Sequence, residues 1–141
     1  MSKAQFNEAQ AAKDFILAGR SRFTLVSKST GQRYTYRVAK KAKADIWFVS
    51  VLTGGDNTGD YTFLGTIFDS GKFFHGKKSA IGFGAGSAKA FRWCWERIAA
   101  LHMPSTVEVW HEGACGRCAR PLTVPESIET GLGPVCMAKA A

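Results

Sequence analysis

One histidine and three cysteines near the C-terminus have the types and spacing to hold a metal: His111, Cys115, Cys118 and Cys136. Two residues separate Cys115 from Cys118, and the first of them is Gly116, which lets the backbone fold tightly enough for both thiolates to approach one ion at about 2.3 Å. Cys136 can add a third thiolate at the start of a short terminal helix, whose dipole favours an anion. The pattern predicts a zinc knuckle.

The fourth ligand of this site has several candidates. His111 is the nearest in sequence, and either imidazole nitrogen would complete a tetrahedral Cys3His site. Cys94 competes for the place, but it shares a helical apolar stripe with Phe91, which favours a buried core thiol. His102 and His75 are further alternatives. A redox Cys-x-x-Cys pair is the competing interpretation of the motif. Four protein ligands leave no position for water, so the expected Zn2+ is structural.

The positive charge of the chain is the second chemical feature. The 141 residues include 19 Lys and Arg against 11 Asp and Glu, which gives a formal charge of +8. Residues 20–43 hold eight basic and no acidic side chains, and residues 72–97 hold six basic side chains against Glu96 alone. Residues 44–71 carry four aspartates and no basic side chain, and the cysteine-bearing end is nearly neutral. Segregated positive charge indicates a polyanion as partner.

Nucleic acid, either DNA or RNA, is the polyanion we expect. The predicted phosphate contacts come from Arg22, Lys28, Arg33, Arg37, Lys40, Lys41 and Lys43. A second patch comprises Lys77, Lys78, Lys89, Trp93 and Arg97. In a helix, Trp93 projects between Lys89 and Arg97, four residues away on either side, so its indole could stack on a base. It could equally anchor a protein interface or be covered by another element.

The elements that must position these residues follow from hydrophobic periodicity. Residues 5–19 have helical spacing, and residues 22–28 and 33–38 form a hairpin around a turn at 29–32. In this hairpin the aromatic side chains fall on one face and the charges on the other, which counts against base stacking there and leaves phosphate contact. Residues 45–53 are apolar on both faces, so we expect a central strand that is covered on both sides.

The second half of the chain continues the same pattern. Residues 61–68 and 72–75 predict a second hairpin, and residues 87–102 predict a helix capped by Ser87 and ended by Pro104. A short strand at 107–110 leads into the cysteines. We therefore expect an α+β fold, with a mainly antiparallel sheet of about five strands and one long helix packed on it. Residues 1–106 would form this α+β domain, and residues 107–141 a C-terminal zinc-binding module, the knuckle.

Other classes of protein are less well supported. Residues 82–87 are glycine-rich and precede a helix, but they lack the Gly-Lys-Ser/Thr of a phosphate-binding loop, and a flexible connector is the better interpretation. No recognisable set of catalytic residues is present, so the sequence favours a binding protein over an enzyme. With no apolar leader or bilayer-length apolar run, we expect no membrane partner and a location in the cytoplasm, where thiols stay reduced.

Residues 115–136, which begin Cys-Gly-Arg-Cys and end Gly-Leu-Gly-Pro-Val-Cys, resemble the C-terminal signature of a family of small uncharacterised proteins in phages and bacteria. The stretches 107–111 and 23–38 also resemble longer members. The resemblance implies a phage or prophage setting, the cytoplasm of a bacterial host cell, and metal binding at Cys115, Cys118 and Cys136. It transfers no activity.

Two functional hypotheses follow. In the first, a phage-type protein binds nucleic acid through its basic surface while zinc serves as scaffold. In the second, the protein inhibits or modulates a host factor, such as a defence complex or a polymerase, by presenting its basic surface to an acidic protein.

Overall fold

The computed structural model describes residues 4–54 and 59–111 of the chain. Within them the helices are α1 (Ala9–Ile16) and α2 (Gly86–Ala99). The strands are β1 (Ala4–Gln5), β2 (Arg20–Ser27), β3 (Arg33–Lys40), β4 (Trp47–Leu52), β5 (Tyr61–Ile67), β6 (Phe73–His75) and β7 (Val107–His111). Neither of these helices is long and apolar enough to cross a membrane.

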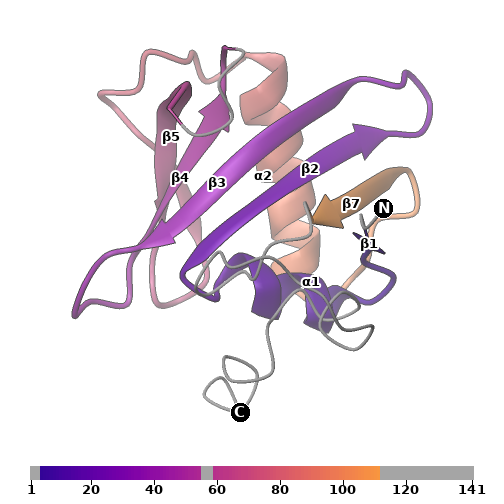
Figure 1. Cartoon of the computed structure of the whole chain (residues 1–141), viewed down its shortest axis with the longest axis horizontal. Helices are drawn as coiled ribbons and strands as arrows, with labels where there is room; N and C mark the ends of the chain where they lie inside the picture. The colour runs from indigo at the N-terminus through magenta and orange to yellow at the C-terminus, as the bar shows by residue number, and fades with distance from the viewer. Residues whose placement is uncertain (1–3, 55–58, 112–141) are drawn as a thin grey trace.

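The strands form one antiparallel sheet in the order β1-β7-β2-β3-β4-β5-β6 (Figure 1). Strands β2 to β6 are neighbours in chain order because short turns join them, and short turns pair strands antiparallel. After α2 the chain returns as β7, which pairs with β2, and β1 adds two residues at the outer edge. The sequence predicted about five strands, whereas the described residues form six plus the two-residue β1.

Both helices lie on the same face of this sheet. The ring centroid of Phe91 on α2 lies 5.2 Å from that of Tyr36 on β3 and 4.9 Å from that of Phe73 on β6. Phe15 on α1 packs against His111 of β7, and His111 lies opposite Phe23 in β2. In Figure 1 strands β2 and β3 lie in front of α2. The face turned away from α1 and α2 is called the open face below.

Buried and more exposed side chains alternate along β2 and β3, and the two strands pair with each other, which confirms the predicted hairpin. Phe23 lies opposite Tyr36, and both side chains are fully buried beneath the helices. Arg22 lies opposite Arg37 on the open face. Because successive side chains of a strand point to opposite sides, burial of the aromatic set directs the arginines outward. The fold thus brings two basic side chains together on a surface that neither described helix covers.

Three details differ from the sequence predictions. The predicted helix over residues 5–19 begins only at Ala9, because residues 4 and 5 pair with β7 as a strand. Ala85 occupies the N-cap position of α2, so Ser87 lies within the first turn of the helix and does not cap it. Strand β4 is central, but it is not covered on both sides, since Phe48 is 39% exposed on the open face.

Candidate nucleic-acid interface

Of the predicted zinc ligands, the described residues include only His111. Its side chain is fully buried at the end of β7, and its ring centroid lies 5.5 Å from that of Phe6 and 5.6 Å from that of Phe15. The predicted ligands Cys115, Cys118 and Cys136 lie outside the described residues. Among the residues that are described, no three His, Cys, Asp or Glu side chains gather into a metal-binding group. The zinc site therefore stays a prediction.

The alternative ligands lie in different settings. Cys94 is 2% exposed on the core side of α2, and burial raises the pKa of its thiol to about 12. A zinc ligand binds as the thiolate, so this environment suits a core thiol better than a ligand. His102 is exposed just after α2, and Nε2 of His75 lies 2.8 Å from the carbonyl oxygen of Ile81.

Arg22 and Arg37 form the basic centre of the open face. They are directly opposite one another on β2 and β3, and both are half-buried. The guanidinium carbon of Arg37 lies 4.6 Å from the ring centroid of Tyr61 on β5, so this side chain reaches across β4 along the sheet. Guanidinium groups present planar sets of donors that match phosphate oxygens, and two of them on adjacent strands can contact one phosphodiester chain.

The other predicted phosphate contacts lie in or near the turns. Lys28 and Arg33 flank the β2–β3 turn, Lys40 ends β3, Lys41 and Lys43 belong to the β3–β4 turn, and Lys77 and Lys78 follow β6; all of them are exposed. Lys40 forms an ion pair with Asp45, with Nζ 3.5 Å from Oδ1. Such exposed lysines are hydrated point charges, which attract a polyanion from a distance more than they orient it.

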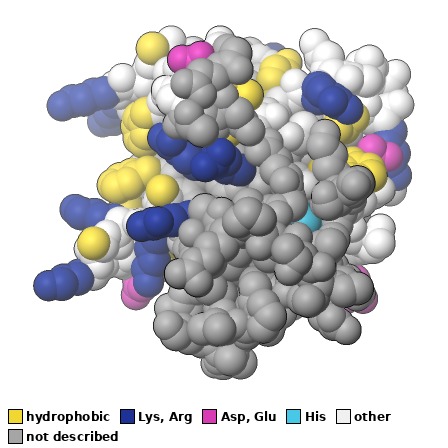
Figure 2. Space-filling view, in the orientation of Figure 1, with side chains coloured by type: hydrophobic (Ala, Val, Ile, Leu, Met, Phe, Trp, Pro, Cys, Tyr) yellow, Lys and Arg dark blue, Asp and Glu magenta, His cyan; other side chains and the backbone are white. Residues whose placement is uncertain are grey.

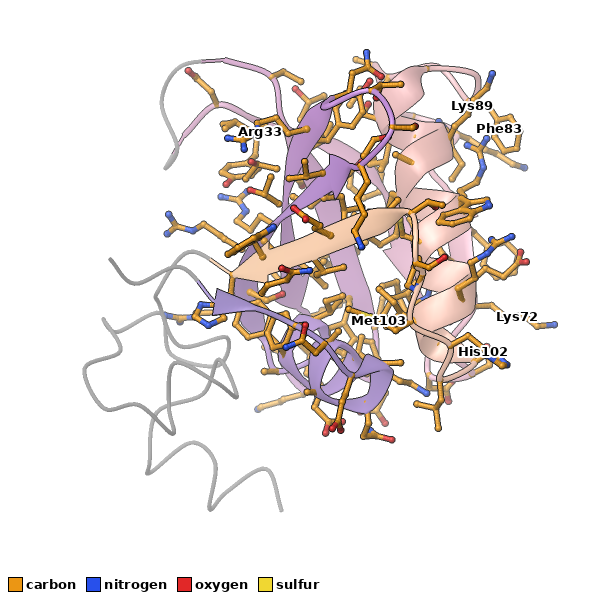
Figure 3. The ribbon with its side chains drawn as sticks, turned by 90° about the vertical axis from the view of Figure 1, so that its right-hand side faces the viewer. Arg33, Lys72, Phe83, Lys89, His102 and Met103 are labelled. Atoms are coloured by element: carbon orange, nitrogen blue, oxygen red, sulfur yellow. The ribbon has the colours of Figure 1, made fainter. Side chains whose placement is uncertain are left out.

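The second predicted patch lies on the other side of the molecule. Lys89, Trp93 and Arg97 occupy the outer side of α2, which packs its apolar stripe on the sheet and turns its polar side away. Figure 3 shows Arg33 and Lys89 on opposite sides of the molecule, with the strands between them. The basic side chains of residues 20–43 and those of α2 therefore do not form one continuous strip, and one polyanion cannot be assumed to contact both patches.

Trp93 is 39% exposed, but one of its faces is occupied. The guanidinium carbon of Arg97 lies 3.8 Å from the ring centroid, and Nη1 of Arg97 donates to the carbonyl oxygen of Trp93 at 2.9 Å. This cation–π contact is an alternative to stacking a base on that side of the indole. The site on α2 is therefore less suited to a base than its sequence suggested.

Aromatic side chains on the open face were missed by the sequence analysis. Four exposed phenylalanines project there from β4 to β6 and from the residue after β5, and we call them the aromatic cluster: Phe48, Phe63, Phe68 and Phe74. The pairing places Phe63 in the same cross-strand row as Arg37, with Ser50 between them. Rings and arginines thus share one face (Figure 2), where hydrophobic side chains lie among Lys and Arg. The sequence carried one signal for Phe63: side chains alternate between the two faces of a strand, so within residues 61–67 Phe63 lies on the same face as Tyr61.

The cysteine-bearing end resembles an uncharacterised family. A family of unknown function (DUF6011) has a model that matches residues 108–141, which begin within β7 and contain Cys115, Cys118 and Cys136. The match covers 34 of the 141 residues, so the open face lies almost wholly outside it. No curated protein and no solved structure matches the chain.

Proposed function

We propose that this protein binds nucleic acid on the open face of its sheet, with phosphates held by Arg22 and Arg37. The observation that carries the proposal is the placement of these two arginines opposite one another at the centre of a sheet face that no described helix covers. The exposed Lys28, Lys41 and Lys43 at the turns add long-range attraction. Neutralisation of phosphates by such groups releases counterions from the nucleic acid, which supplies much of the binding free energy.

A structural zinc completes the proposal. His111, Cys115, Cys118 and Cys136 would hold the ion, which would tie the end of the chain to β7, within the sheet. The phage-type setting rests on the resemblance of the C-terminal motif. In this scheme the ion supplies stability and takes no part in binding, because the positive charge lies on the other segments.

The test is a salt titration with two matched double variants. Arg22→Gln with Arg37→Gln removes two charges from the open face, and Lys89→Gln with Arg97→Gln removes two from α2. Fluorescence polarisation would report binding of labelled single-stranded and double-stranded oligonucleotides at several salt concentrations. Each lost phosphate contact should reduce the slope of log K against log salt by about 0.7 for a single strand and about 0.9 for a duplex. We expect this change for the open-face variant and a much smaller one for the α2 variant.

Equal losses in the two variants would mean that net charge, not the open face, governs binding. No binding of the parent protein at low salt would end the proposal.

The second candidate function is modulation of an acidic host protein, and the observation that favours it is the exposed Trp93 beside Lys89 and Arg97 on α2. Trp and Arg side chains are common anchors of protein interfaces. A pull-down from nuclease-treated host lysate separates the candidates. A stoichiometric protein partner that the α2 double variant loses would support this second function, and loss of all binding after nuclease treatment would support the first.

A further inference from the structure

The phosphate binding proposed above does not use the aromatic cluster on the same face. Phe74 on β6 is 56% exposed, and Phe48 on β4, Phe63 on β5 and Phe68 are each more than a third exposed. Together they form an apolar area on a face that also carries arginines. Grouped exposed aromatic side chains of this kind mark interaction sites more often than isolated ones do.

The cluster consists of two pairs of perpendicular rings. The centroids of Phe48 and Phe63 are 6.3 Å apart, with 69° between the ring planes. Those of Phe68 and Phe74 are 5.4 Å apart, with 72° between the planes. Because the rings of a pair are nearly perpendicular, only one ring in each pair can lie parallel to a given base. The cluster therefore offers two stacking positions.

The backbone beneath Phe63 holds its ring in place. A Cβ atom added at Gly76, the residue after β6, would lie 2.5 Å from this ring, so the absence of a side chain lets the ring lie against the backbone. Gly76 is itself fixed by a hydrogen bond from its N–H to the carbonyl oxygen of Leu64, at 2.9 Å. The contact shows that the position of this exposed ring is determined by packing.

The sheet places these rings beside the arginines. One cross-strand row consists of Arg22, Arg37, Ser50 and Phe63, and the next consists of Arg20, Ala39, Phe48, Thr66 and Phe74. Neighbouring strands are about 4.8 Å apart, so the backbone of Phe63 lies about 10 Å from that of Arg37 across the sheet. The guanidinium of Arg37 lies closer to β5, because it contacts the ring of Tyr61 on that strand. A strand of nucleic acid lying over both rows would have phosphates near the arginines and bases near the rings.

We propose that the open face binds single-stranded nucleic acid, stacking two unpaired bases on the aromatic cluster while Arg22 and Arg37 hold the phosphates. This inference rests on the proposed function and specifies its ligand. In a duplex the base faces are stacked on one another, so the rings can recognise only unpaired bases. The neighbouring arginines favour a polyanion over an apolar protein surface, since charge complementarity selects the partner.

The experiment measures binding of oligo-dT, oligo-U and a duplex by the full-length protein. Phe48→Leu and Phe74→Leu each remove one ring, one from each pair, and keep an apolar side chain. Phe83→Leu is the matched control, because Phe83 is exposed on the loop before α2, under the guanidinium of Arg92, and Figure 3 shows it away from Arg33. Circular dichroism and thermal unfolding would compare the folding of all variants with that of the parent.

Loss of one stacked base should weaken single-strand binding by about 5- to 150-fold, while the control and the duplex affinity stay unchanged. Phe74→Tyr should restore binding, since tyrosine also stacks. A 2-aminopurine base in the oligonucleotide should be quenched by the parent protein and by Phe74→Tyr, and less by Phe74→Leu. Oligo-dT and oligo-U separate DNA from RNA as the natural source.

Unchanged single-strand affinity in both leucine variants, together with the reduced salt slope of the arginine variant, would overturn the stacking inference and leave phosphate binding intact. Equal weakening of single-strand and duplex binding would overturn it as well, because the rings would then not distinguish unpaired bases. Binding to no oligonucleotide would remove both proposals. Self-association that the leucine variants abolish, without any single-strand binding, would show instead that the aromatic cluster joins two copies of the chain.

Discussion

Stability at alkaline pH should report directly on the environment of Cys94. Burial raises the pKa of its thiol from 9.0 to about 12 in the folded protein. Above pH 9 the unfolded chain therefore releases a proton that the folded protein retains, so the free energy of unfolding must fall as pH rises. This contribution is fully present below pH 9 and is lost progressively up to about pH 12. Between pH 8 and pH 10.5 the two pKa values correspond to a loss of about 2 kcal/mol.

The Cys94→Ala variant separates this contribution from those of the groups that the two proteins share. Urea unfolding of both proteins would be followed at pH 8 and pH 10.5. Removal of the thiol adds a packing cost that is the same at both pH values. Tyr36, whose hydroxyl donates to the carbonyl oxygen of Ser87 at 2.6 Å, has its pKa raised mainly by burial and only secondarily by Cys94, so it contributes nearly equally in both proteins. We expect the stability advantage of the parent over the variant to shrink by about 2 kcal/mol across this range.

The opposite result would identify Cys94 as a metal ligand. A zinc-bound thiolate is already deprotonated in the folded state, so the advantage of the parent would grow as pH rises towards 9 and the variant would lose metal. A pH-independent difference would show that the thiol is not buried as the core packing of α2 requires. Either outcome would refute the assignment of Cys94 to the core.

The remaining predictions concern the metal and the core. Freshly purified protein should contain about one zinc per chain by elemental analysis, and less than half an equivalent would contradict the Cys3His site. Phe91→Ala should lower the free energy of unfolding by about 3–5 kcal/mol in urea titrations, because this ring is 1% exposed and packs on Phe23, Tyr36, Phe73 and Trp95. Exposed Phe83→Ala should change it by about 0.5 kcal/mol or less, and equal effects of the two substitutions would place the core elsewhere.

The sequence predicted the β2–β3 hairpin well because the alternation of side chains between the two faces determines which residues are buried. Side chains alternate between faces, and Phe23 and Tyr36 are buried on the helix side, so the direction of Arg22 and Arg37 follows. The sequence also placed Trp93 between Lys89 and Arg97, away from the apolar stripe of α2, and the structure agrees, since the buried residues of this helix include none of the three. A helix that packs its apolar stripe on a sheet must turn its charged side away from that sheet, so the two basic segments had to be separated.

The aromatic cluster was harder to predict, for two physical reasons. Strand β4 is apolar on both sides, and this pattern is typical of burial between two layers, so nothing in it distinguishes exposed Phe48 from buried Val49. In β5 the register shifts, since Ser50 pairs with Phe63 while Val49 pairs with Gly65. Leu64 is therefore an extra residue in β5, and the side chains after it point to the opposite face from the one that regular alternation predicts.

The most direct test of nucleic-acid binding at the open face is an NMR titration of 15N-labelled protein with a single-stranded oligonucleotide at low salt. We predict that the largest chemical-shift changes fall on the open-face residues of β3, β4 and β5 and on the guanidinium signal of Arg37. The amides around Trp93 on α2 should change little. Shift changes centred on α2, or none at saturating oligonucleotide, would contradict the account.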